Sequence, residues 1–156
     1  MTDCPMCTKW HDEPELRIAE LARCCVLLNR DQFFPGYVFV FTKEHVTELF
    51  HLDREVRTTV MEEVTAVAAA LYNLFKPAKI NYELLGNMVP HMHWHLVPRF
   101  ATDPLWPRPI WSEPHAEVFL PPVAYAERIA LIRKHILAGE MEGTTYTRTH
   151  TDANPV

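Results

Sequence analysis

The chain has no cluster of lysine and arginine residues, and its formal net charge is -5. A broad surface for nucleic acid or for an anionic membrane requires many clustered cations, so we expect neither partner. No apolar run approaches the roughly 18 residues that a membrane-spanning helix needs, and no basic segment followed by an apolar stretch opens the chain. We therefore expect a cytoplasmic protein.

The sequence also lacks an internal repeat, and its 156 residues fit one domain that buries a substantial apolar core. We expect that domain over residues 1–138. Residues 139–156 are polar and rich in threonine, a composition that predicts a disordered tail.

Cysteine is scarce, with four residues that form two close pairs in the sequence. Cys4 and Cys7 have the C-x2-C spacing, which in a cytoplasmic protein favours a metal clip over a disulfide. Cys24 and Cys25 are adjacent within an apolar run and are interpreted as core residues. One C-x2-C motif is weak evidence, so the alternative that the first pair lies in a frayed N-terminus and binds nothing stays open.

Apolar patterns predict both strands and helices. The runs 24–28 and 37–41 are typical of strands, and the turn at Pro35-Gly36 between them predicts a hairpin. A long helix is expected from a cap at Asp53 to about residue 75, before Pro77. Its apolar residues recur at steps of three and four: Val56, Val60, Val64, Val67, Leu71 and Leu74.

The second half of the chain predicts two more strands, a loop and a helix. Residues 79–85 and 91–99 are the strands, on either side of the turn Gly86-Asn87. Six prolines from Pro104 to Pro122 predict an ordered, irregular loop whose tryptophans either pack on the domain or cover a nucleotide base. A short helix is expected over residues 125–137.

Three histidines alternate with apolar residues in the last predicted strand. Alternate side chains of a strand point to opposite faces, so His91, His93 and His95 share one face, and the apolar face packs against the long helix. Burying three imidazoles without a function leaves polar nitrogens to satisfy, at a cost of about 1–3 kcal/mol for each unpaired one. The histidine face is therefore the candidate site.

Aligned imidazoles support two kinds of chemistry. In covalent catalysis, the neutral central histidine attacks an α-phosphate while its neighbours bind phosphate oxygens or protonate the leaving group. In the alternative, two or three of the histidines bind zinc in a hydrolase, which needs a carboxylate or a water position as well. The nearest acid in the sequence is Glu83.

The run HMHWHLVPR, residues 91–99, resembles the motif of the histidine-triad (HIT) family, in which three histidines alternate with apolar residues and Pro-Arg follows. Leu28-Asn29-Arg30 with the Pro35-Gly36 turn, and Asn81 with Gly86-Asn87, are similar to other parts of the same domain. The resemblance extends from Cys4 to Arg99. It implies an α+β, HIT-like fold with an antiparallel sheet of about five strands, one long helix and a C-terminal helix, usually as a homodimer.

The resemblance also implies residue roles. His93 would be the nucleophile, His95 would contact the phosphate or leaving group, and His91 would support the orientation of the site. A nucleotide, expected to carry adenine, would contact Asn29 through its ribose and Asn81 near the scissile phosphate, with Asn87 also on the nucleotide side.

Some members of the family pair a C-x2-C motif with two histidines. By this resemblance Cys4, Cys7, His45 and His91 would hold a structural zinc ion, and catalysis would require no cofactor. The chain departs from the family's pattern at Tyr37, where many members have a histidine, and the segment from Asn81 to His91 is one residue shorter. These departures affect the relay position and the leaving-group contacts.

We thus expect a nucleotide hydrolase or nucleotidyl transferase that cleaves at the α-phosphate of an adenosine phosphoramidate or a dinucleoside polyphosphate through a nucleotidyl-histidine intermediate. Two alternatives remain: a zinc-dependent hydrolase that uses the triad as metal ligands, and a nucleotide-binding module without turnover.

Overall fold

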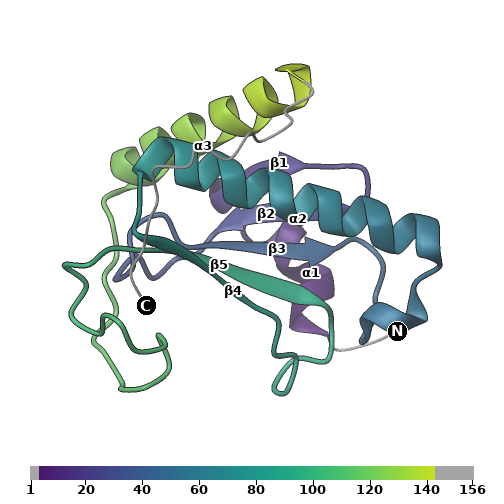
Figure 1. The fold of residues 1–156 in the computed structure, drawn as a ribbon, viewed down its shortest axis with the longest axis horizontal. Helices are drawn as coiled ribbons and strands as arrows, with labels where there is room; N and C mark the ends of the chain where they lie inside the picture. The colour runs from purple at the N-terminus through teal and green to yellow at the C-terminus, as the bar shows by residue number, and fades with distance from the viewer. Residues whose placement is uncertain (1–3, 143–156) are drawn as a thin grey trace.

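The computed structural model describes residues 4–142, and its centre is a five-stranded antiparallel sheet with the order β1-β2-β3-β5-β4 (Figure 1). The strands are β1 (Arg17–Glu20), β2 (Cys24–Leu28), β3 (Val38–Thr42), β4 (Lys79–Glu83) and β5 (His93–Arg99). The α-helices are α1 (Pro5–Asp12), α2 (Arg54–Phe75) and α3 (Pro122–Glu142), with short 3₁₀ turns at Pro14–Leu16 and Leu49–His51. The expected α+β fold is confirmed.

One face of the sheet forms the main core against α2 and α3, which lie above the sheet in Figure 1. The apolar stripe of α2 packs there, and so do three isoleucines of α3. The core also receives Trp94 and Leu96 from β5 and Met92 from the position just before it. These are the apolar residues that alternate with the histidines. The predicted division of this strand into an apolar and a histidine face therefore holds for the apolar side.

The opposite face of the sheet is covered by two separate segments. Helix α1 packs through Cys4 and Met6 on residues of β2 and β3, and it lies below the sheet in Figure 1. The proline-rich loop between β5 and α3 packs through Leu105 and Ile110 beside Val97 of β5. The histidines of β5 lie on this face, between the two coverings.

The β2–β3 hairpin is built around a buried glutamine and a glycine. The Gln32 side chain donates to the Asn29 carbonyl at 2.7 Å and accepts from the Gly36 amide at 3.0 Å. Gly36 has φ +84°, and a Cβ atom there would lie 2.6 Å from the ring of Phe75 at the end of α2. The predicted Pro35-Gly36 turn therefore requires glycine, both for its backbone conformation and for the close approach of α2.

Several elements differ from the sequence expectations. Helix α1 and strand β1 were not predicted. Asp53 occupies the N-cap position of α2, but its side chain makes no capping hydrogen bond. The C-terminal helix is longer than expected and ends at Glu142, so residues 139–142 of the expected tail are helical, and 143–156 lie outside the described residues. Within residues 4–142, none of the helices has both the length and the apolarity to cross a bilayer.

Candidate functional site

The three histidines lie together, but they do not form one straight row on the strand. His93 and His95 belong to β5, whereas His91 comes before the strand begins. The ring centroids of His93 and His95 are 5.0 Å apart. The exposed fractions are 1% for His91 and 7% for each of the other two, because α1 and the proline-rich loop cover this face. The histidine face is thus largely covered in this structure.

The tautomer of His93 follows from one hydrogen bond. Its Nδ1 lies 2.6 Å from the backbone carbonyl oxygen of His91. A carbonyl oxygen only accepts, so Nδ1 of His93 carries the proton and donates it. In the neutral ring the lone pair is therefore on Nε2, which is the form a nucleophile needs.

His95 is joined to Tyr37 through a hydrogen bond between its Nδ1 and the phenol hydroxyl. Burial, together with the neighbouring His93, lowers the pKa of His95 from 6.5 to about 4, so the ring is neutral at pH 7. Burial likewise raises the pKa of Tyr37, with Glu83 and Asp31 as further causes, and keeps its hydroxyl protonated. Tyr37 therefore contacts the triad directly.

Two aromatic rings border the imidazole pair. The ring of Phe39 lies 5.1 Å from His95 and 6.3 Å from His93, and the ammonium group of Lys9 from α1 lies 5.4 Å from the Phe39 centroid. On the other side, Trp111 of the proline-rich loop packs at 5.4 Å, edge to face, against His95. Its indole N–H donates to the carboxylate of Glu83, which pairs with His95 across the β4–β5 ladder.

A second cluster of donors brings both N-terminal cysteines to the triad. Potential ligand atoms of Cys4, Cys7, His45 and His91 all lie within 4.8 Å of one another. The His91 Nδ1 atom is 3.5 Å from the Cys4 sulfur and 3.4 Å from that of Cys7, and His45 Nδ1 is 3.3 Å from Cys7. Two thiols and two imidazoles are a donor set that suits tetrahedral zinc.

The ring of His91 is oriented for such a metal. Its Nε2 lies 2.7 Å from the carbonyl oxygen of Thr42 and must carry the proton, so the Nδ1 lone pair faces the sulfurs. Burial is the main cause that lowers the pKa of His91, which favours the neutral ligand form. The residues thus fit a zinc ion, and the frayed N-terminus alternative is not what the structure shows: α1 begins directly after Cys4.

The predicted nucleotide contacts come from three different parts of the chain. Asn29 lies half-buried at the end of β2, and its backbone amide donates to the Tyr37 carbonyl. Asn81 pairs with Val97 rather than with a histidine, and its side-chain oxygen accepts from Arg99 at 2.8 Å. Asn87 is exposed in the segment between β4 and β5. Their roles toward a nucleotide stay predictions.

Arg99, which ends the triad motif, is almost fully buried. Its Nε atom donates to Asp103 at 2.9 Å, and its guanidinium carbon lies 5.0 Å from the Phe34 ring centroid and 6.0 Å from that of Trp106. The exposed fraction of Arg99 is 1%. This arginine is therefore neither a surface residue nor a contact of the imidazole pair.

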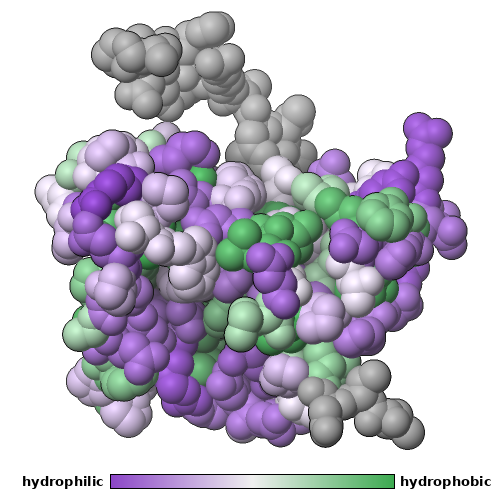
Figure 2. Space-filling model, turned by 90° about the horizontal axis from the view of Figure 1, so that it is seen from below, coloured by the Kyte–Doolittle hydropathy of each residue, from purple (hydrophilic) through white to green (hydrophobic). Residues whose placement is uncertain are grey.

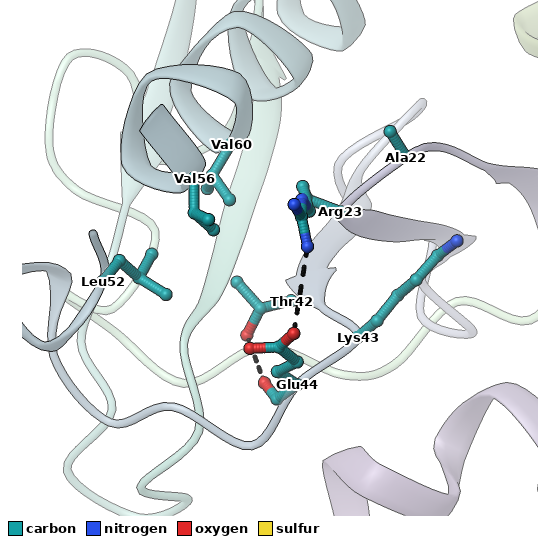
Figure 3. Close-up of a pocket in the computed structure, with 8 residues that line it drawn as sticks. All are labelled: Ala22, Arg23, Thr42, Lys43, Glu44, Leu52, Val56 and Val60. Carbon is teal, nitrogen blue, oxygen red and sulfur yellow. Dashed lines mark hydrogen bonds and ion pairs between the residues drawn. The ribbon is translucent and has the colours of Figure 1, made fainter. Parts of the chain in front are cut away.

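Cys24 and Cys25 are buried, and a small cavity lies near α2. Burial is the main cause that raises the pKa values of Cys24 and of Cys25, the latter to about 11, so both are core thiols as expected. A cavity of about 80 Å³ lies beside α2 on the main-core side. Two of its lining residues, Arg23 and Glu44, form an ion pair at 3.9 Å, which is drawn as a dashed line in Figure 3. The cavity is well below the roughly 300 Å³ of a small-molecule site.

The match to a family model decides the classification. The model described as HIT domain matches residues 11–102, which is more than half of the chain. The chain belongs to the HIT family. The matched segment of this HIT protein contains the β2–β3 hairpin, α2 and all three triad histidines.

Known proteins agree with this membership. Protein hit of Bacillus subtilis (strain 168) is 26% identical over 95 residues, which are 58% of this chain and 66% of that relative. The crystal structure of a histidine triad protein from Bradyrhizobium japonicum matches with a TM-score of 0.72 and 27% identity, over 80% of this chain and 94% of that one. The HIT protein thus spans about two thirds of the curated relative.

A zinc-bound histidine triad family protein from Mycobacterium smegmatis also has the same fold. Its TM-score is 0.65 with 21% identity, over 90% of this chain and 97% of that one. At this identity the likeness shows the fold alone.

For three residues around the triad, the sequence alone does not establish the observed place. Lys9 lies in the unpredicted helix α1, and for Trp111 the sequence leaves both packing and base stacking open. Glu83 is the nearest acid in the sequence, and it lies opposite His95 only once the β4–β5 register is known. No sequence signal places Lys9 near Phe39 or Trp111 beside His95.

Proposed function

We propose that this HIT protein is a nucleotide hydrolase or nucleotidyl transferase that acts through a covalent nucleotidyl intermediate on His93. The observation that carries the proposal is the hydrogen bond from His93 Nδ1 to the His91 carbonyl, which leaves the Nε2 lone pair available. The substrate class is a nucleoside monophosphate, expected to carry adenine, joined through its α-phosphate to an amine or to a second phosphate.

The first step forms a phosphorus–nitrogen bond. The Nε2 lone pair of His93 attacks the α-phosphorus, and the bond from phosphorus to the leaving group breaks, with its electron pair departing on the leaving group. When Nδ1 of His95 accepts from the Tyr37 hydroxyl, Nε2 of His95 carries a proton that it can donate to phosphate or to the leaving group.

The second step restores the histidine. A water molecule, or another acceptor hydroxyl, attacks the same phosphorus, the phosphorus–nitrogen bond breaks, and its electron pair returns to His93 Nε2. The acceptor loses a proton, and the nucleoside monophosphate or its ester is released. All atoms in this route come from protein, substrate and acceptor.

The cysteine-histidine group is assigned to a structural zinc ion. Cys4, Cys7, His45 and His91 would hold it, and four protein ligands would leave no position for an activated water. Among residues 4–142, neither His93 nor His95 belongs to this ligand group. The arrangement therefore supports the covalent route over the zinc-dependent hydrolase. The homodimer and the cytoplasmic location remain predictions.

His93→Ala tests the proposal directly. We expect turnover of adenosine phosphoramidates and dinucleoside polyphosphates to fall by at least about 10³-fold, since the nucleophile is removed, while AMP binding persists. Mass spectrometry of the unmodified protein, quenched during turnover, should show an added nucleotidyl group on the peptide that contains residue 93.

His51→Ala is the matched control, because His51 is exposed and lies outside the site; it should retain normal turnover. Near-normal activity of His93→Ala would exclude covalent catalysis. Tight AMP binding by the unmodified protein with no turnover across the panel would favour the binding-module alternative.

A further inference from the structure

Trp111 is unusual among the residues that surround the triad, because it is half exposed and yet touches a triad histidine. Its exposed fraction is 54%. Its ring packs edge to face against His95, and its indole N–H donates a hydrogen bond to the Glu83 carboxylate. A large aromatic side chain left half in water beside reacting groups is a surface on which a ligand can stack.

The loop around Trp111 is held in place from several sides. The neighbouring Ile110 is buried with 3% of its surface exposed, and Leu105 with 5%. Farther along, Asp31 in the hairpin turn accepts from His115 at 2.7 Å and from the Val118 amide at 2.8 Å. Trp111 is therefore carried by a fixed loop, so its place beside His95 does not depend on a ligand.

The site has two sides, which are defined by the strands on either side of β5. Phe39 and Asn29 belong to the hairpin side, where β2 and β3 lie. Glu83, which binds the indole, belongs to β4 on the other side of β5. A nucleoside bound on the hairpin side leaves the Trp111 side for the group that departs. Figure 2 shows the face below the sheet, where apolar patches lie among hydrophilic residues.

We infer that Trp111 is a specificity-determining residue that binds the leaving group, and that it selects leaving groups with a flat aromatic ring near the scissile bond. Glu83 acts as a positioning residue, because its carboxylate fixes the plane of the indole. This inference rests on the proposed function, since it needs a leaving group next to His95. Stacking of a flat ring on an aromatic side chain is strong enough to discriminate between substrates.

A pair of matched substrates tests the inference. Adenosine 5′-phosphoramidates of phenylethylamine and of cyclohexylethylamine carry leaving groups of similar size, and only the first is flat. We expect the unmodified protein to prefer the phenyl compound in kcat/KM on the order of 10-fold. In Trp111→Ala this ratio should fall to about one, and Trp111→Phe should restore part of the preference.

Two further variants separate the side chain from the loop. Trp106→Ala removes the other tryptophan of the same loop, which lies over Arg99 rather than His95, and the preference should persist. Glu83→Gln should reduce the preference and leave the melting temperature unchanged. A loss of preference in Trp106→Ala equal to that in Trp111→Ala would overturn the inference, because the loop as a whole would then be responsible.

Binding to a non-reacting protein gives a readout that does not need turnover. In His93→Ala, the phenyl compound should bind more tightly than the cyclohexyl compound, and adding Trp111→Ala should remove the difference. An unchanged ratio in the double variant overturns the role of Trp111 while the covalent route stands. If the unmodified protein forms no nucleotidyl adduct with either compound, the proposed function fails, and a binding difference that still depends on Trp111 would retain the stacking site alone.

Discussion

His91 contacts the two N-terminal cysteines through its ring and His93 through its backbone. Its ring faces the two cysteines, while its backbone carbonyl accepts a hydrogen bond from His93 Nδ1. Because Thr42 fixes the other ring nitrogen, the side chain has one tautomer that fits all contacts. The orientation of the proposed nucleophile and the geometry of the proposed zinc site are therefore set by one residue.

The buried His95 ring predicts a pH dependence of stability. Its folded pKa of about 4 lies below the ordinary 6.5, so the unfolded chain binds more protons between these values, and stability rises with pH across that window. Lowering the pH from 7 to 5 should therefore reduce the unfolding free energy by about 2 kcal/mol through this ring. Urea unfolding gives the unfolding free energy of the unmodified protein and of His95→Gln at pH 7 and at pH 5. The loss on going to pH 5 should be larger in the unmodified protein by this amount. Equal losses would contradict the burial of a neutral His95.

At the scale of single residues, the sequence predicts which histidines share a face but not what each nitrogen bonds to. Alternation with Met92, Trp94 and Leu96 is a local pattern, and a strand imposes it directly. The partners of His95 come from elsewhere: Tyr37 from the hairpin and Trp111 from the loop. Such contacts depend on the register of β3 with β5 and on the path of the loop, which no local pattern encodes.

Helix α1 is the element that links the proposed zinc site to the covered face. It begins after Cys4 and contains Cys7 and Lys9, and it has only eight residues. Isolated helices of that length are marginal in water, so α1 depends on its packing against the sheet. In the proposed zinc site it would also be held by the metal bound to Cys7. The short length of α1 explains why the sequence did not predict it, whereas the 22-residue α2 showed a clear apolar period.

Cys7→Ser tests the dependence of α1 on the metal. We expect the zinc content to fall from about one ion per chain to near zero, because a ligand is lost, and the amides of α1 to exchange hydrogen at least about 10-fold faster. Hydrogen exchange with mass spectrometry should show α2 unchanged. Cys25→Ala, a core cysteine outside the ligand group, should keep its zinc. Full zinc content in Cys7→Ser, or unchanged exchange in α1, would contradict the assignment.

Across the whole molecule, one face of the sheet forms the main core and the other contains the candidate site. The core against α2 and α3 contains apolar residues from every strand of the sheet, whereas the triad, Cys4, Cys7 and Trp111 lie on the other face. The family's overall fold was predictable because long apolar periods and turn residues specify it. The covering of the histidines was not predictable, since α1 is short and the path of the irregular loop has no local pattern.

Leu71→Ala tests this division. Leu71 is fully buried in the main core, so its truncation should lower the unfolding free energy by about 2–5 kcal/mol. Turnover per folded molecule should stay within about twofold, because the change is on the face away from the histidines. Leu131→Ala is the control, since Leu131 is 49% exposed. Denaturant unfolding and kcat/KM measure both; a large drop in turnover of the folded Leu71→Ala protein would contradict the division.

The guanidinium of Arg99 shows how a family motif can contribute to structure rather than to chemistry. It bonds to Asp103 of the loop and to Asn81 of β4 and lies against the rings of Phe34 and Trp106. Lysine, with a single terminal nitrogen and no planar face, cannot reproduce these contacts together. An exchange of the two basic residues would therefore keep the charge and still detach the hairpin turn, the edge strand and the proline-rich segment from their common anchor.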